Sequence, residues 1–174
     1  MILKGLKEKS IKKNLNLILK SRSSSTSNDK IESLGIILNA EETNDFETLK
    51  TLAATLNVRP NKLKIIAFTS SKKEEIYSWN VCFNPKDFSW NGKIKNTELQ
   101  SFLDTKFDLL ISYYSEDVLE LKYLTAASKA NFKVSIFQKD KRFNDLIIKT
   151  KFKNIKAFKV ELFKYLVVLN KIKK

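Results

Sequence analysis

The segment from Phe107 to Phe137 constrains the fold of this chain more than any other part of the sequence. Residues 108–113 (DLLISY) form a nearly continuous apolar run, which is typical of a strand covered on both faces. Apolar side chains then recur at helical spacing from Val118 to Ala127, and a second apolar run occupies residues 133–137. A strand, a helix and a strand in this order predict a right-handed crossover within a parallel sheet.

The rest of the chain repeats this alternation of strands and helices. Strand-like runs cover residues 33–39, 62–69 and 145–149, and helical periodicity covers residues 43–57, 96–103 and 153–171. Thr43 or Asn44 is placed to cap the first of these helices, with Glu47 completing a capping box after Asn44. We therefore predict an α/β fold: a three-layer, doubly wound and mainly parallel sheet of four or five strands, flavodoxin-like or Rossmann-like.

Residues 76–95 interrupt this rhythm. Aromatic and apolar residues alternate with polar ones on both sides of the turn-forming sequence Asn84-Pro85-Lys86-Asp87. This pattern predicts a hairpin, or an edge strand followed by a loop. Both tryptophans, Trp79 and Trp90, lie in this stretch, and we expect their rings to pack in the core beneath the connection.

The composition argues against several kinds of chemistry. The chain has no histidine, one cysteine and three glycines, and it contains neither a G-x-G-x-x-G nor a G-x-x-x-x-G-K-[ST] motif. The chain is thus short of the residues that form a zinc, haem or iron–sulfur site, a general base at neutral pH or a glycine-rich phosphate loop. We predict no catalytic residue, no metal and no cofactor, and a non-enzymatic role is favoured.

The sequence also sets expectations for location. Cys82 has no partner for an internal disulfide, and no signal peptide is evident, which favours the cytoplasm. No apolar run approaches the roughly 18 residues that a transmembrane helix requires. We expect a soluble protein, or at most a peripheral one.

The positive charge is concentrated at the two ends of the chain. Residues 1–30 hold eight basic and two acidic residues, residues 31–138 hold 13 and 14, and residues 139–174 hold 12 and three. The net charges are therefore +6, −1 and +9, within a total of +14. A neutral body with basic ends is suited to binding a polyanion, because each neutralised phosphate releases counterions.

Residues 1–20 have the periodicity of a basic amphipathic helix. Residues 21–32 begin with the polar sequence SRSSSTSND and predict a flexible linker to a single α/β domain, residues 33–174, which ends in the long basic helix. Three destinations suit the leading helix: its own domain, an anionic membrane, or RNA. The membrane destination is weakened because no Trp or Phe precedes Phe46.

Basic residues alternate with aromatic ones between Phe137 and Lys159. Lysines can contact phosphates while an exposed aromatic ring stacks on an unpaired base, and Phe143 and Phe152 are the rings that the helical pattern leaves free for this. A solvated lysine-rich face is the alternative. The candidate nucleic-acid-binding residues are Lys4, Lys7, Lys9, Lys12, Lys13, Lys20, Arg22, Lys139, Lys141, Arg142, Lys149, Lys151, Lys153 and Lys156.

The ends of the predicted strands offer a second candidate site. Open parallel sheets bind ligands beyond the carboxyl ends of their strands, where Thr69, Ser70, Tyr113 and Ser115 are placed to meet a phosphorylated substrate. Ser71 and Lys72 extend this polar run, and acidic residues (Glu41, Glu42, Glu116 and Asp117) are expected at the same edge. The simpler interpretation is that Ser115 is a helix N-cap followed by two first-turn acids.

With its sheet pattern, its basic leading helix and the segment FDLLISYYSEDVLELKYLTAASKANFKVSIF, the chain resembles a family of short bacterial proteins of unknown function. The resemblance covers most of the chain and implies an α/β domain, but it includes no catalytic motif and implies no site.

These observations favour a non-enzymatic RNA-binding protein associated with the ribosome or its assembly, with ribosomal RNA and ribosomal proteins as partners. Two alternatives stay open. One is an enzyme or small-ligand binder acting at the strand ends, and the other is a peripheral membrane protein anchored by residues 1–20.

Overall fold

Six parallel strands form one sheet in the order β3-β2-β1-β4-β5-β6. The structure is a computed structural model that describes residues 2–23, 29–43, 45–70, 81–136 and 139–172. The strands are β1 (Leu34–Asn39), β2 (Leu63–Phe68), β3 (Val81–Phe83), β4 (Leu109–Tyr113), β5 (Phe132–Ser135) and β6 (Leu146–Ile147). This confirms the predicted α/β fold. The sheet is fully parallel, has one strand more than the largest number predicted, and follows the Rossmann order.

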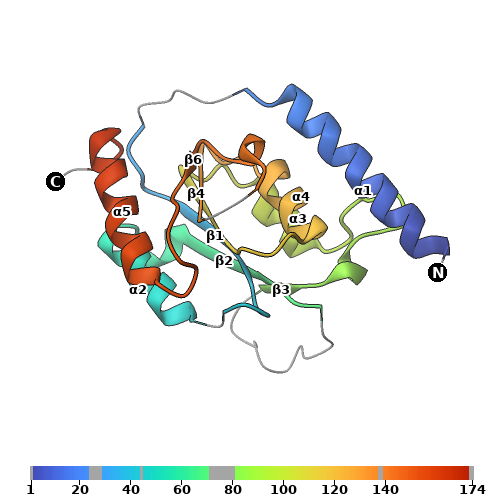
Figure 1. The fold of residues 1–174 in the computed structure, drawn as a ribbon, viewed down its shortest axis with the longest axis horizontal. Coiled ribbons are helices and arrows are strands. Elements are labelled where there is room, and N and C mark those ends of the chain that lie inside the picture. The colour runs from blue at the N-terminus through green and yellow to red at the C-terminus, as the bar shows by residue number, and fades with distance from the viewer. Residues whose placement is uncertain (1, 24–28, 44, 71–80, 137–138, 173–174) are drawn as a thin grey trace.

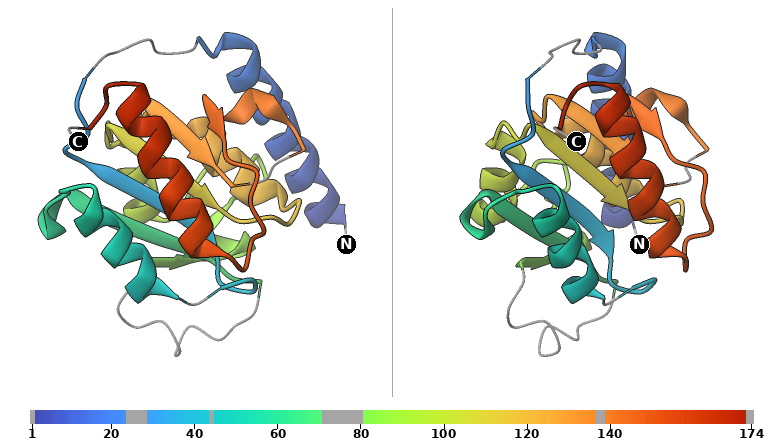
Figure 2. Two further views of the ribbon diagram at one scale, coloured as in Figure 1. Left: turned by 60° about the vertical axis from the view of Figure 1, so that its left-hand side comes forward. Right: turned by 90° about the vertical axis from the view of Figure 1, so that its left-hand side faces the viewer.

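Helices cover both faces of this sheet (Figures 1 and 2). They are α1 (Ile2–Ser21), α2 (Phe46–Thr55), α3 (Thr97–Asp104), α4 (Leu119–Ala127) and α5 (Ile155–Val168). The apolar sides of α2 and α5 share one core cluster with the sheet, and those of α3 and α4 share another. Because consecutive strand side chains alternate between faces, Ile36 and Ile111 enter the first cluster while Ile37 and Leu110 enter the second.

Side-chain caps start three of the helices, although not always at the expected residue. The carboxylate of Asp45 accepts the backbone N–H of Thr48 and caps α2, so the expected cap at Thr43 or Asn44 is wrong. Asn96 and Asn154 cap α3 and α5 in the same way. The α4 helix begins at Leu119, after Val118, without a side-chain cap. The expected N-cap at Ser115 is therefore also wrong.

The segment predicted as a hairpin or an edge strand contains both. β3 is the edge strand beside β2, and Phe88 and Ile94 form an isolated antiparallel bridge around a tight turn. The indole of Trp90 in this turn is 64% exposed, so the expected core position of Trp90 is wrong. Trp79 lies outside the described residues.

Hydrogen bonds join residues 30–31, which lead into β1, to residues 170–171, which follow α5. The N–H of Ile31 donates to the carbonyl of Lys171 at 3.0 Å, and the ammonium of Lys30 donates to the carbonyl and side-chain oxygens of Asn170 at 2.6 and 2.7 Å. The ring of Phe132 lies 4.6 Å from the ammonium of Lys171. The approach to β1 and the end of α5 are thus held together.

Gly35 is required by the close packing between β1 and α3. A Cβ at this position would lie 2.7 Å from Cδ2 of Phe107 and 3.1 Å from Cζ of Phe102, and both rings are buried. We expect Gly35→Ala to lower the free energy of unfolding by roughly 1–3 kcal/mol, because the rings must shift in a filled core. Denaturant unfolding would measure this. Gly5→Ala is the control: it meets nothing within 4 Å on an exposed helical turn and should not destabilise the protein.

Candidate nucleic-acid interface

The α1 helix packs on its own domain, the first of the three destinations considered for it. Ile11 and Leu15 are buried: Ile11 joins the core beside α3 and α4, while Leu15 packs with Ala126 and Phe143. The basic residues lie outside this apolar stripe. Those that are exposed are Lys4, Lys9, Lys12, Lys13 and Lys20. Lys7 is half-buried, and its ammonium donates to the carbonyl of Pro85.

Arg22 fastens the end of α1 to the start of β6. Its Nη2 donates to Oδ1 of Asp145 at 2.6 Å, and its Nη1 donates to the carbonyl of Arg142 at 2.7 Å. The two paired side chains are only 17% and 9% exposed. Arg22 is thus committed to a contact within the chain rather than free to meet a phosphate, although the sequence placed it among the candidate binding residues.

A buried lysine lies beside this pair. The ammonium of Lys133, on β5, donates to the carbonyls of Thr125 and Ala126 at 2.9 and 3.0 Å, so it satisfies acceptors at the end of α4. Its backbone N–H donates to Oδ2 of Asp145 at 2.8 Å. Burial, followed by the charge of Arg22, lowers the pKa of Lys133 to about 8, and the carboxylate of Asp145 acts in the opposite direction.

The segment after β5 carries three candidate residues, of which two have unpaired charges. The guanidinium of Arg142 donates three hydrogen bonds to the carboxylate of Asp140, at 2.6, 3.0 and 3.1 Å. These bonds lower the pKa of Asp140 and pair the guanidinium of Arg142 with a carboxylate of the same segment. Lys139 and Lys141 are exposed and form no ion pair within the described residues.

The connection from β6 to α5 and the first turn of α5 present the remaining candidates. Lys149, Lys151, Lys153 and Lys156 are exposed, and no described acidic group pairs with them. The ring of Phe152 in this connection lies 4.9 Å from the ring of Tyr113, whose hydroxyl donates to the carbonyl of Phe152. Burial, with the charges of Asp45 and Glu42, raises the pKa of Tyr113 to about 12. These contacts hold the connection against the sheet and turn its lysines outward.

The basic segments meet around one edge of the sheet rather than on one flat face. The bonds of Arg22 place the end of α1 next to residues 142–145, and β6 is the edge strand. Beyond β6 the chain passes to α5, which covers the face of the sheet opposite to α3 and α4, as Figure 2 shows. We call the exposed lysines along this path the basic belt. Its members are Lys12, Lys13, Lys20, Lys139, Lys141, Lys149, Lys151, Lys153 and Lys156.

The aromatic rings expected to stack on bases are not available in the belt. Phe143 is 2% exposed and packs beneath α1, and Phe152 is half-buried against Tyr113. Both were expected to be free because the sequence gives no sign that α1 and Tyr113 would cover them. Phe137 lies outside the described residues.

The carboxyl ends of the strands are occupied by the chain's own carboxylates. Glu41 accepts bonds from the Thr69 hydroxyl and from the N–H and hydroxyl of Ser70, at 2.9 to 3.0 Å. Glu42 accepts the N–H of Ser115 at 3.0 Å, along with its hydroxyl. In the Rossmann order the ligand crevice lies between β1 and β4, which is where Glu42 sits. The donors that would bind a phosphate are thus already used, and the local charge is negative. Ser71 and Lys72 lie outside the described residues.

The acidic cluster expected at this edge forms in part. The amide of Asn39 donates to the carboxylates of both Glu42 and Glu116, at 3.2 and 3.4 Å, whereas Asp117 pairs with Lys122 on α4. Within the described ranges, no group of three or more acidic, cysteine or histidine side chains has the arrangement of a metal site.

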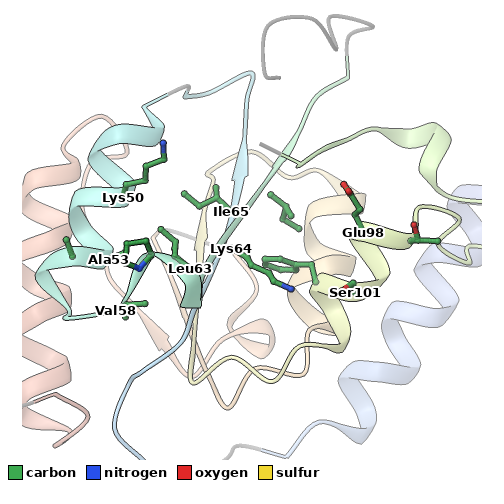
Figure 3. A pocket seen from close by; sticks show the side chains of 13 residues that line it. Lys50, Ala53, Val58, Leu63, Lys64, Ile65, Glu98 and Ser101 are labelled. Carbon is green, nitrogen blue, oxygen red and sulfur yellow. The ribbon is translucent and has the colours of Figure 1, made fainter. Parts of the chain in front are cut away.

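A cavity of about 700 Å³ lies away from these strand ends, between α2 and α3 beside the first half of β2 (Figure 3). Its walls are mainly apolar, with Ala53, Val58 and Leu63 on one side and Lys64 and Glu98 at the rim. Thr97, Ser101 and Lys50 also line it.

Comparison with known proteins places the chain among related sequences without assigning it an activity. A model described as "Family of unknown function (DUF6913)" matches residues 7–169. No curated protein and no solved structure matches the chain significantly.

Proposed function

Since the chain belongs to DUF6913, a family of unknown function, we propose its function from its own residues: it is a non-enzymatic RNA-binding protein. The observation that carries the proposal is the basic belt, whose lysines are exposed and have no ion-pair partner among the described residues. Exposed, unpaired ammonium groups keep their hydration and counterions until a polyanion replaces them, and this exchange favours binding.

The shape of the belt supports RNA as the polyanion. The lysines follow a helix, a turn and an extended connection around a sheet edge, so they do not form the single inserted helix of a major-groove reader. Lysine side chains are long and flexible, so lysines placed around a sheet edge can reach the irregularly spaced phosphates of a folded RNA. Recognition would then depend on the shape of the RNA, because the belt offers no exposed aromatic ring and no free arginine for reading bases.

A ligand recognised by shape must have a fixed fold. We propose that this ligand is ribosomal RNA, which the protein meets with ribosomal proteins in the cytoplasm, on the ribosome or during its assembly. Sedimentation of a native lysate at low salt tests this placement. The protein should travel with ribosomal particles and leave them as salt is raised. Sedimentation at the top of the gradient at low salt would contradict it.

The binding surface is tested by charge reversal. We expect Lys→Glu at Lys12, Lys13, Lys151 and Lys153 to weaken binding to a structured RNA by roughly a hundredfold and to reduce the slope of log K against log salt by about 3 to 4. Fluorescence anisotropy across a salt series measures both quantities.

The matched control replaces with Glu four exposed lysines of residues 31–138, the nearly neutral part of the chain. These are Lys62, Lys64, Lys86 and Lys106. It produces the same change in net charge at positions outside the belt. If both variants lose the same affinity, binding depends only on total charge and the belt is not the interface.

A further inference from the structure

The N-terminal end of α1 exposes an apolar surface that the proposed RNA interface does not use. Ile2, Leu3 and Leu6 are 82%, 69% and 46% exposed, and Trp90 is 64% exposed. Leu3 and Trp90 line the same groove of about 710 Å³, which α1 and the turn after β3 form together. Exposed aliphatic side chains grouped with a tryptophan are unusual on a surface that meets only water.

Contacts between α1 and this turn fix the two walls of the groove relative to each other. Lys7 donates to the carbonyl of Pro85. Gly92, at a φ of 76°, approaches the backbone of α1 so closely that a Cβ there would lie 3.1 Å from the nitrogen of Ile11. The N–H of Ser89 bonds to the carbonyl of Lys93 at 2.8 Å and closes the turn. Trp90 is therefore presented by a braced turn.

Charged residues surround this apolar surface. Lys4 and Lys95 are exposed in the lining of the groove, and Glu8 and Glu120 lie half-buried in its wall. Lys9, on α1, and Lys93, in the turn, are also exposed. Exposed aliphatic side chains at a helix end, with a tryptophan beside one of them and lysines nearby, match the boundary between acyl chains and anionic headgroups.

We propose that Ile2, Leu3, Leu6 and Trp90 form a membrane-docking tip that inserts shallowly into an anionic lipid surface. The helix does not lie flat in the membrane, because Ile11 and Leu15 pack on its own domain and only residues 2–6 form a continuously exposed run at its start. No helix in the described residues has the length and apolarity needed to cross a bilayer. The tryptophan that the leading helix lacks comes from a turn more than 80 residues later in the chain.

Lipid explains the tip better than a second RNA contact. A base could stack on Trp90, but the three aliphatic side chains would gain nothing from an RNA backbone. The tip lies about 30 Å from Lys20 along a helix of 20 residues, and its residues are separate from Lys12 and Lys13, the belt lysines nearest to it on α1. The two proposals therefore rest on different residues and can fail separately.

Flotation of the full chain with lipid vesicles tests the tip. The protein should float with vesicles of phosphatidylcholine and phosphatidylglycerol at low salt and float at least fivefold less with phosphatidylcholine alone. The variant L3S/L6S/W90S should lose at least four-fifths of the flotation. The control L17S/V168S/L169S removes three other exposed apolar side chains and should float like the wild type.

The environment of Trp90 and the folding of the tip variant are measured separately. In a W79F background the fluorescence of Trp90 should shift to the blue on anionic vesicles, and circular dichroism should show the tip variant folded. Wild-type protein that stays unbound, or a tip variant that floats normally, would overturn the proposal. So would a tip variant that loses RNA binding, or one that converts a dimer to a monomer by light scattering, since the surface would then serve RNA or a second copy.

Discussion

Replacing Arg22 with alanine is expected to lower the free energy of unfolding by roughly 2–4 kcal/mol, because it leaves the nearly buried carboxylate of Asp145 without its cationic partner. The same change removes the bond from Nη1 to the carbonyl of Arg142 and so loosens the end of α1. Urea unfolding followed by circular dichroism measures the loss.

Arg142→Ala is the matched control for this prediction. It removes the same side chain from an ion pair with the same kind of partner, but Arg142 is 63% and Asp140 33% exposed. Exposed pairs contribute about 0–1 kcal/mol, so the control should have a small effect. Equal losses in the two variants would mean that the Arg22 contact does not anchor α1.

The second large effect concerns pH and Lys133. Its pKa is about 8 in the folded protein, against an ordinary value of 10.5, so between these values the unfolded chain binds more protons than the folded one. Stability contributed by this group therefore rises with pH in that interval, by about 2 kcal/mol from pH 7 to pH 9.5. Below pH 8 the folded protein must hold a charged ammonium in a buried place.

Comparison with Lys133→Met isolates this titration from those of other groups. The difference in unfolding free energy between wild type and variant should shift by about 2 kcal/mol in favour of the wild type from pH 7 to pH 9.5. Tyrosine ionisation affects the wild type and the variant alike and therefore cancels in this difference. A difference that stays constant over the interval would show that the Lys133 ammonium titrates as an exposed lysine does.

Most of the fold was predictable because its signals are local. The uninterrupted apolar runs gave five of the six strands, and helical spacing located all five helices to within a few residues. The short edge strand β3 was harder, since three residues carry little pattern and its pairing depends on β2. The caps were misplaced by one to three residues because several polar residues precede each helix and only the three-dimensional path selects among them.

The candidate site was predictable only in part. Exposure of the belt lysines follows from their spacing, but the pairings of Arg22 and Arg142 with Asp145 and Asp140 depend on how the segment after β5 folds back. The burial of Phe143 beneath α1 and the 64% exposure of Trp90 also depend on distant parts of the chain. Long-range contacts of this kind leave no periodic signal in the sequence.

The contact between Ile31 and Lys171 means that the sheet and its helices form a ring closed at the entrance of β1 and the exit of α5. α1 lies outside that ring and is attached to it by its own side-chain contacts. A linker between residues 172 and 29 would thus permute the chain without crossing a strand, with the new ends in a surface loop and α1 released as a separate peptide. That peptide would return to its seat only through its buried stripe and Arg22, because no chain would join it to β1.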